Sequence, residues 1–411
     1  MGDICEQYGL GLRDTLAVHD AHRLVSGRVA PLITWVAASI LQDLRTEVAQ
    51  DPSVKVAFMA RDGHVLAAAI RGLDPELFDR HCTEIRMSRN VMEALWQDSP
   101  GGYLPLDEKT FRTYKGRVSA EAAAGAIHHT RDYLRRCGLP VDTPGTRVVL
   151  VDDGLRGGGG EVLHHVFGWD TFSHLTVAAV PPKHPRPDRV KGHLFHLGPD
   201  EWQGGTVEYL PDDPARTLLC DQALHVWETF ISGPQNTVDH IGPDGPVSGE
   251  LPLWPGTRVP KQWANTTALQ AMRASVLLAA YAHASAYRGV PPDQVMREQR
   301  EGRDRFVSDL RRIVRGDRSL DGTYTAMLWT TADRATAPTQ SQHRTMTAIA
   351  NSFTGLTAQL PASVRSERRI PSVTSPMAAF RDPGATCVTC PEPPTTRAPE
   401  SRRGKGLELR Q

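Results

Sequence analysis

One segment of the 411-residue chain, from Arg147 to Phe167, constrains the fold more than any other. An apolar, β-branched run over residues 148–151 ends in two adjacent carboxylates, Asp152 and Asp153, and four consecutive glycines follow at 157–160. This pattern predicts a buried strand, an acidic tip, a glycine loop and a helix over residues 161–167. Glycines let backbone N–H groups converge on one point, and a helix N-terminus adds partial positive charge, so the pattern predicts a phosphate site.

The segment resembles the ribose-phosphate signature of type I phosphoribosyltransferases, in which four apolar residues and two acids precede an apolar position and a loop of glycine and hydroxyl residues. The positions that match it in register are Asp152, Asp153, Leu155, Gly158 and Gly159. Gly157 and Gly160 stand where that family usually has hydroxyl residues, and Arg156 adds a charged hydrogen-bond donor to the loop. The resemblance implies an α/β fold with a mainly parallel sheet of phosphoribosyltransferase-like type.

Two earlier segments fit the same family. A predicted strand beginning at Val54 leads into Arg61, Asp62 and Gly63 and then a helix of small residues, and a second predicted strand, over 83–87, ends at Ser88 and Arg89. The carboxyl ends of parallel strands meet at one edge of a sheet, so we expect all three loops to lie together.

The resemblance also implies roles for these residues. Arg61 to Gly63, with Ser88 and Arg89, would bind a diphosphate, and Arg156 to Gly160 would bind a 5′-phosphate. Asp152 and Asp153 would hold ribose hydroxyls and Mg²⁺ and act at ribose C1. The predicted function is therefore a phosphoribosyltransferase-like enzyme, a pentosyl transferase with a diphosphate-bearing ribose as its ligand.

Haloacid-dehalogenase-type (HAD-like) hydrolases are an alternative, because they also carry an acidic pair at a strand tip and an Asp-x-Asp-Gly motif after an earlier strand. Here that motif reads Ala60-Arg61-Asp62-Gly63, and alanine cannot accept a phosphoryl group. The alternative is a degenerate phosphohydrolase. A narrower resemblance, over residues 27–240, is to bacterial proteins often labelled hydrolase-like, which share Arg-Asp-Gly, Ser-Arg and Val-Asp-x-Gly-x-Arg-Gly in this order.

A third hypothesis is a binding or regulatory module without turnover, which would bind a sugar phosphate or nucleotide. Structural explanations also stay open: Asp62 and Ser88 could cap helices, and the Asp152–Asp153 pair could bond its own turn. A dinucleotide fingerprint and a Walker loop are disfavoured, since neither G-x-G-x-x-G nor Gly-Lys-Ser/Thr follows the strand. The chain also lacks a Gly-x-Ser-x-Gly elbow and metalloprotease histidine spacing.

Composition limits the partners. The 47 basic and 47 acidic residues cancel, which argues against nucleic acid or a membrane surface as a partner. With no basic leader or long apolar run, we expect a cytoplasmic protein. Six scattered cysteines predict reduced thiols, and the single C-x-x-C, at 387–390, is a weak metal signal. Whether the chain forms a homodimer stays open.

Patterning along the chain predicts four parts. These are an N-terminal helical segment over 1–50, an α/β core with hood insertions over 51–260, a helical cap over 261–360, and a disordered tail over 361–411. Residues 90–117 read as irregular, residues 120–137 as one helix, and residues 266–287 and 292–315 as two long helices.

Overall fold

The computed structural model describes residues 1–60, 62–100, 118–203, 206–207, 231, 233–234, 237–248 and 267–314. Within this part the protein is an α/β structure built on a five-stranded sheet in which every pair of neighbouring strands is parallel. The predicted α/β class and parallel sheet are therefore confirmed. The predicted tail over 361–411 lies outside the described residues.

The sheet has the strand order β2-β1-β3-β4-β5. Its strands are β1 Lys55–Met59, β2 Cys82–Ile85, β3 Arg147–Asp152, β4 Asp170–Ala179 and β5 Val190–Leu197. Two short antiparallel pairs lie outside it: β6 Trp202–Gln203 with β7 Thr206–Val207, and β8 Val238–Gly242 with β9 Gly245–Ser248. β1 and β3 are apolar and almost wholly buried, as expected for strands covered on both faces.

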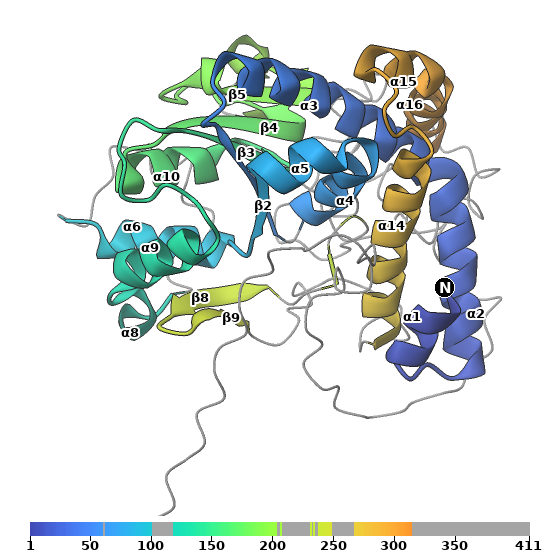
Figure 1. Ribbon diagram of the computed structural model, residues 1–411, viewed down its shortest axis with the longest axis horizontal. Coiled ribbons are helices and arrows are strands. Elements are labelled where there is room, and N and C mark those ends of the chain that lie inside the picture. Colours follow the sequence, from blue (N-terminus) through green and yellow to red (C-terminus); the bar gives the residue numbers. More distant parts are fainter. Residues whose placement is uncertain are drawn as a thin grey trace, which may run out of the picture.

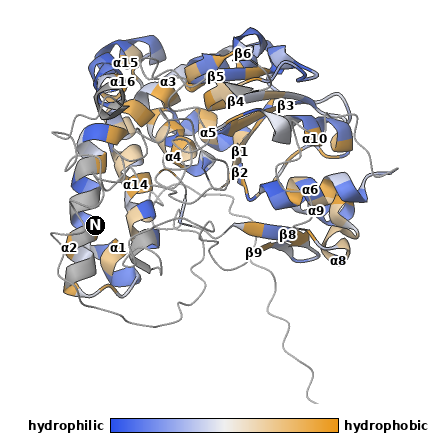
Figure 2. Cartoon of the chain, turned by 180° about the vertical axis from the view of Figure 1, so that it is seen from behind, coloured by the Kyte–Doolittle hydropathy of each residue, from blue (hydrophilic) through white to orange (hydrophobic). Residues whose placement is uncertain are grey.

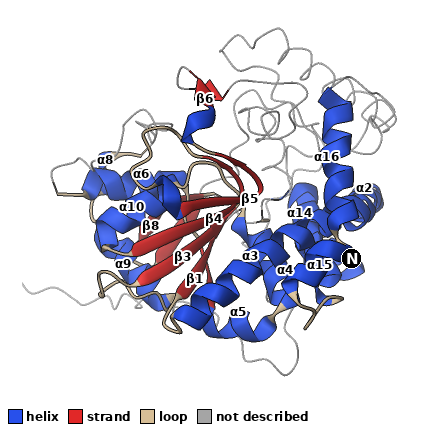
Figure 3. Cartoon of the chain, turned by 90° about the horizontal axis from the view of Figure 1, so that it is seen from above, coloured by secondary structure: helices blue, strands red, loops and turns tan. Residues whose placement is uncertain are grey.

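Helices cover both faces of the sheet (Figures 1 and 3). One face packs against α3 Ala30–Gln50 and α4 Gly63–Leu73, and α14 Thr267–Ser285 packs on these two helices. The other face packs against α6 Arg89–Asp98, α9 Ala126–Arg136 and α10 Gly158–Phe167. Alternate residues of a strand point to opposite faces of the sheet. In β1, Val56 and Phe58 pack in the core with α3, α4 and α14, whereas Ala57 and Met59 pack in the core with α6, α9 and α10. α14 thus shares a core with the sheet.

The remaining helical segments are short or peripheral. They are α1 Gly2–Gln7, α2 Leu12–Leu24, the π-helical turn η1 Val25–Val29, α5 Pro75–His81, α8 Ala120–Ala123, η2 Pro187–Arg189, η3 Pro199–Glu201, α15 Pro292–Glu298 and α16 Arg300–Val314. None of the described helices combines the length and apolar character that crossing a membrane requires.

Three predicted boundaries are wrong. Residues 90–98, expected to be irregular, belong to α6, whose buried side is apolar and whose other side is polar (Figure 2). The helix expected over 120–137 is two helices, because Gly125 adopts a left-handed φ of 73° between them. The helix expected over 292–315 is likewise divided, at Gln299.

Candidate functional site

The strand order places a topological switch point between β1 and β3, where the connections leave the sheet toward opposite faces. α4 follows β1 and packs with α3 and α14, whereas α10 follows β3 and packs with α6 and α9. The N-termini of α4 and α10 therefore flank the carboxyl ends of two adjacent strands. In open α/β sheets this edge is the usual place for a ligand.

The loops after β1 and β3 touch at this edge. A Cβ added to Gly63 would lie 2.7 Å from the carbonyl oxygen of Val151 and 3.7 Å from the Cα of Asp152. The absence of a side chain at Gly63 therefore allows the start of α4 to reach the end of β3. The structure thus brings together Asp62 and Gly63 with the acidic pair, and Arg61 lies outside the described residues.

Asp62 occupies the N-cap position of α4, but its side chain makes no capping hydrogen bond there. Its carboxylate, half-buried, therefore does not have the helix-capping role that the pattern left open. Asp62 thus contributes a carboxylate close to the point where the two loops meet.

The acidic pair belongs to the end of the sheet rather than to an open loop. The backbone N–H groups of Val177 and Ala179 donate to the carbonyl oxygens of Asp153 and Leu155 at 3.0 and 2.8 Å, so strand-like pairing continues beyond Asp152. The Asp152 carboxylate is half-buried and accepts the Asp153 N–H at 2.8 Å, whereas Asp153 is 1% exposed. Of the two carboxylates, Asp152 is the more accessible.

The four glycines are part of a helix start. α10 begins at Gly158 rather than at Glu161 as expected, and Gly157 caps it with a left-handed φ of 70°. A Cβ on Gly157 would meet Val190 at 2.5 Å, and one on Gly160 would meet the hydroxyl of Ser173 at 2.7 Å. Close packing of α10 on the sheet therefore requires glycine at these two positions, whether or not a ligand binds.

A buried ion pair holds this helix start in place. Glu161, in the first turn of α10, is 2% exposed, and both of its carboxylate oxygens accept from Nε of Arg186 at 3.1 Å. Arg186 also donates to the Thr171 hydroxyl at 2.8 Å, and that hydroxyl donates to the carbonyl of Gly160 at 3.0 Å. Burial lowers the pKa of the neighbouring His184, whose Nδ1 accepts the Arg186 N–H. The segment after β4 thus fixes the glycine loop.

Arg156, the added charge of the loop, is half-buried. Its guanidinium lies over the ring of Trp202, the first residue of β6, 5.4 Å from the ring centroid. A cation–π contact of this kind orients the side chain without neutralising its charge. No motif in the sequence indicates that Trp202 belongs to this region.

The third predicted loop reaches the same edge. Arg89 is exposed in the first turn of α6, and Met92 of that helix lies 3.5 Å from the position of a Cβ on Gly159. The Ser88 hydroxyl accepts the Val91 N–H at 3.2 Å and donates to the carbonyl of Val238 in β8. Ser88 is therefore the cap of α6 and its link to β8.

Because the Ser88 hydroxyl makes two structural hydrogen bonds, we expect Ser88→Ala to lower the free energy of unfolding by about 1–2 kcal/mol, the typical cost of a lost N-cap. Urea denaturation followed by circular dichroism measures this. Ser119→Ala, which removes the cap of the short helix α8, is the matched control and should cost less because Ser119 is exposed. A loss no larger than that of the control would contradict the structural role of Ser88.

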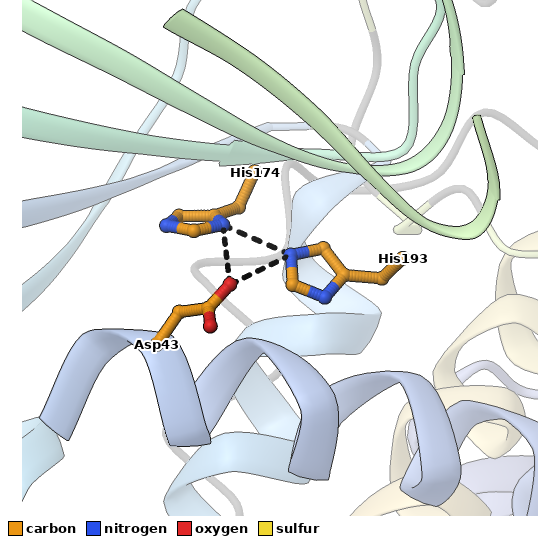
Figure 4. A group of neighbouring side chains, drawn as sticks. All are labelled: Asp43, His174 and His193. Carbon is orange, nitrogen blue, oxygen red and sulfur yellow. Dashed lines mark hydrogen bonds and ion pairs between the residues drawn. The ribbon is translucent and has the colours of Figure 1, made fainter. Parts of the chain in front are cut away.

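Sequence reasoning missed one further polar group. Asp43 of α3, His174 of β4 and His193 of β5 present side-chain ligand atoms within 4.8 Å of one another (Figure 4). These residues belong to three separate elements, so they do not form a recognisable metal-binding motif in the sequence.

Comparisons of the chain with protein-family models, with curated proteins and with solved structures gave no match.

Proposed function

We propose that the edge between β1 and β3 binds a diphosphate-bearing ribose phosphate with Mg²⁺, and that the protein acts as a phosphoribosyltransferase-like enzyme on ribose C1. The main support for this proposal is the close approach of Gly63 to the end of β3. This approach brings the N-termini of α4 and α10 and the accessible carboxylate of Asp152 to one switch point. Carboxylates beside a phosphate site are suited to a ligand that also carries ribose hydroxyls and Mg²⁺.

Phosphate binding rests on the two helix starts. The first N–H groups of any helix have no partner within the helix, and the helix dipole makes that end positive. In α10 the Gly160 N–H already donates to the Gly157 carbonyl at 3.0 Å, which leaves the Gly158 and Gly159 N–H groups to face a ligand. Together with Arg156 these groups would hold the 5′-phosphate, and the start of α4 with Arg61 and Arg89 would hold the diphosphate.

The acidic residues suit the ribose and the metal. Mg²⁺ usually binds one or two carboxylates together with substrate phosphates and water, and Asp152 offers such a carboxylate at the strand end. Mg²⁺ would neutralise charge on the diphosphate as it leaves. The cationic centre that forms at ribose C1 is stabilised by nearby negative charge, which Asp152 and Asp153 supply. The buried Asp153 would act through its field rather than by direct contact.

Calorimetry with phosphoribosyl diphosphate and Mg²⁺ tests the proposal directly. We expect saturable heat for the unaltered chain and at least a tenfold weaker affinity for Arg156→Ala, since a charge-assisted hydrogen bond contributes about 1.5–3 kcal/mol. Asp152→Asn should also weaken Mg²⁺-dependent binding. Asp188→Asn is the matched control, because that carboxylate is 78% exposed in η2. A folded sample with no heat at millimolar ligand would refute the proposal.

A second candidate, a binding module without turnover, is favoured by the packing of the glycine loop. Val190 and Ser173 leave no space for the hydroxyl side chains that phosphoribosyltransferases usually carry at the positions of Gly157 and Gly160. Ligand binding would then rest on backbone groups and Arg156 alone. Measuring diphosphate release from bound phosphoribosyl diphosphate with a range of amine and base acceptors separates the two: heat without release supports the module, and release supports the enzyme.

A further inference from the structure

The cluster of Asp43, His174 and His193 lies where α3 packs against β4 and β5 (Figure 4). Nδ1 of His174 lies 2.9 Å from Nε2 of His193, and these two atoms lie 3.6 and 3.8 Å from Oδ2 of Asp43. The two imidazole side chains are 1% and 0% exposed, and Asp43 is 27% exposed. The three atoms therefore face one another at the boundary between core and solvent.

The dimensions of this triangle fit a metal ion. A point equidistant from the three atoms lies about 2 Å from each of them, which is the bond length of Zn²⁺ to imidazole nitrogen and carboxylate oxygen. An ion slightly out of their plane, toward the solvent side where Asp43 lies, would have three protein ligands and an open fourth position. A coordination shell of two imidazoles and one carboxylate favours a transition metal over Mg²⁺ or Ca²⁺.

The surrounding residues orient both rings for this purpose. Nε2 of His174 lies 3.2 Å from Oε1 of Glu47, whose other oxygen accepts from Arg147 at 3.0 Å. An ionised carboxylate only accepts, so Nε2 of His174 carries the proton and Nδ1 presents a lone pair to the cluster. A histidine that donates its second N–H to a carboxylate is the usual arrangement at protein metal sites.

His193 can present its lone pair in the same way. The His193 side chain is 0% exposed, and each of its ring nitrogens faces a polar partner. Nε2–H of His193 donates to Nδ1 of His174 at 2.9 Å, and the Ser39 hydroxyl donates to Nδ1 of His193 at 2.8 Å. With a metal, His193 loses the proton at Nε2 and gains one at Nδ1, which then donates to Ser39, so that the net proton count is unchanged.

A lysine pairs with the carboxylate of this cluster. Nζ of Lys191 lies 2.6 Å from Oδ2 of Asp43, the same oxygen that faces the two histidines. The Lys191 side chain is 48% exposed, so it can move into solvent when a metal takes that oxygen. Lys191 is therefore a competitor of the metal, and removing its charge should strengthen metal binding.

We propose that Asp43, His174 and His193 form a binding site for a divalent transition metal of the Zn²⁺ type, linking α3 to β4 and β5. This site is independent of the ligand proposed at the switch point. Its ligands come from the helix before the sheet and from the last two strands, so an occupied site would join the two ends of this α/β unit.

Titration of the chelator-treated full-length chain with Zn²⁺ by calorimetry, and with Co²⁺ by visible absorption, tests the proposal. We expect one ion per chain at this site and a Co²⁺ spectrum of low-symmetry nitrogen and oxygen coordination without a thiolate charge-transfer band. Asp43→Asn should weaken affinity by at least about tenfold, because loss of a ligand costs no less than loss of an outer partner. Lys191→Met should instead tighten binding.

Both test variants replace a side chain that is at least partly exposed, 27% for Asp43 and 48% for Lys191, so they avoid the folding risk of replacing a buried histidine. His128→Ala is the matched control, since it removes an exposed histidine whose Nε2 lies 3.4 Å from Asp132, and it should leave affinity unchanged. Cys387→Ser with Cys390→Ser should also leave it unchanged, which separates this site from the C-x-x-C pair. The proposal would be overturned if the unaltered chain did not bind Zn²⁺, or if Asp43→Asn did not weaken binding. It would also be overturned if binding were lost only when Cys387 and Cys390 were replaced.

Discussion

Arg186→Ala should lower the free energy of unfolding by about 3–5 kcal/mol, the usual cost of removing one partner of a buried ion pair. The reason is that Glu161 would be left as an uncompensated charge in a site where it is 2% exposed. The substitution would also remove the donor that holds Thr171 against the Gly160 carbonyl, so the start of α10 would loosen. Urea denaturation at neutral pH measures the loss.

Arg189→Ala is the matched control for this experiment. Arg189 lies three residues further along the chain and pairs with Asp170 at 3.3 Å, where both side chains are about one-third exposed, so its loss should cost no more than about 1 kcal/mol. Replacing both buried partners, as Glu161→Leu with Arg186→Met, should recover much of the stability lost with Arg186→Ala. Equal losses for Arg186→Ala and Arg189→Ala would contradict the role of the buried pair.

Gly63→Ala should destabilise the protein, although a glycine-to-alanine change within a helix ordinarily stabilises it by about 0.5–1 kcal/mol. The new methyl group would lie 2.7 Å from the backbone carbonyl oxygen of Val151, and backbone atoms at the end of a central strand cannot move aside easily. Relief of the clash would push α4 away from β3, at a cost of about 1–3 kcal/mol. The sign of the change is therefore diagnostic.

Chemical denaturation of Gly63→Ala beside Gly198→Ala gives the comparison. A Cβ on Gly198 would meet nothing within 4 Å, and its φ of −81° suits any residue, so that control should change stability by less than about 0.5 kcal/mol. Calorimetry on the same samples should show weaker binding of phosphoribosyl diphosphate to Gly63→Ala only. A Gly63→Ala protein as stable as the unaltered chain would show that the two loops do not touch as described.

Several features of the fold could be predicted from local pattern. The apolar runs of β1 and β3 have the length and composition of strands buried on both faces, and the acidic pair lies at the end of β3, whose last residue is Asp152. Because parallel strands place their carboxyl ends at one edge, the meeting of the loops after β1, β2 and β3 followed as well. The start of α10 was placed three residues late, since glycine has a low intrinsic preference for helix.

The roles of individual residues depend on contacts between distant parts of the chain, which a local sequence pattern does not contain. Gly157 and Gly160 read as a phosphate loop, yet Val190 and Ser173 explain them by packing alone. Ser88 read as a ligand contact, yet its hydroxyl caps α6 and bonds Val238. In each case the deciding neighbour belongs to an element distant in the sequence.

Local patterns in the sequence are enough to locate most strands and helices and the loops that carry charge, because these properties depend on residues a few positions apart. Three other features depend on how the whole chain packs: β1 and β3 are neighbours, Glu161 pairs with Arg186, and Asp43 lies beside His174 and His193. Strand order and helix placement are set by burying apolar faces on both sides of the sheet. That requirement acts on the whole chain at once. It therefore brings together side chains that are far apart in the sequence and share no motif.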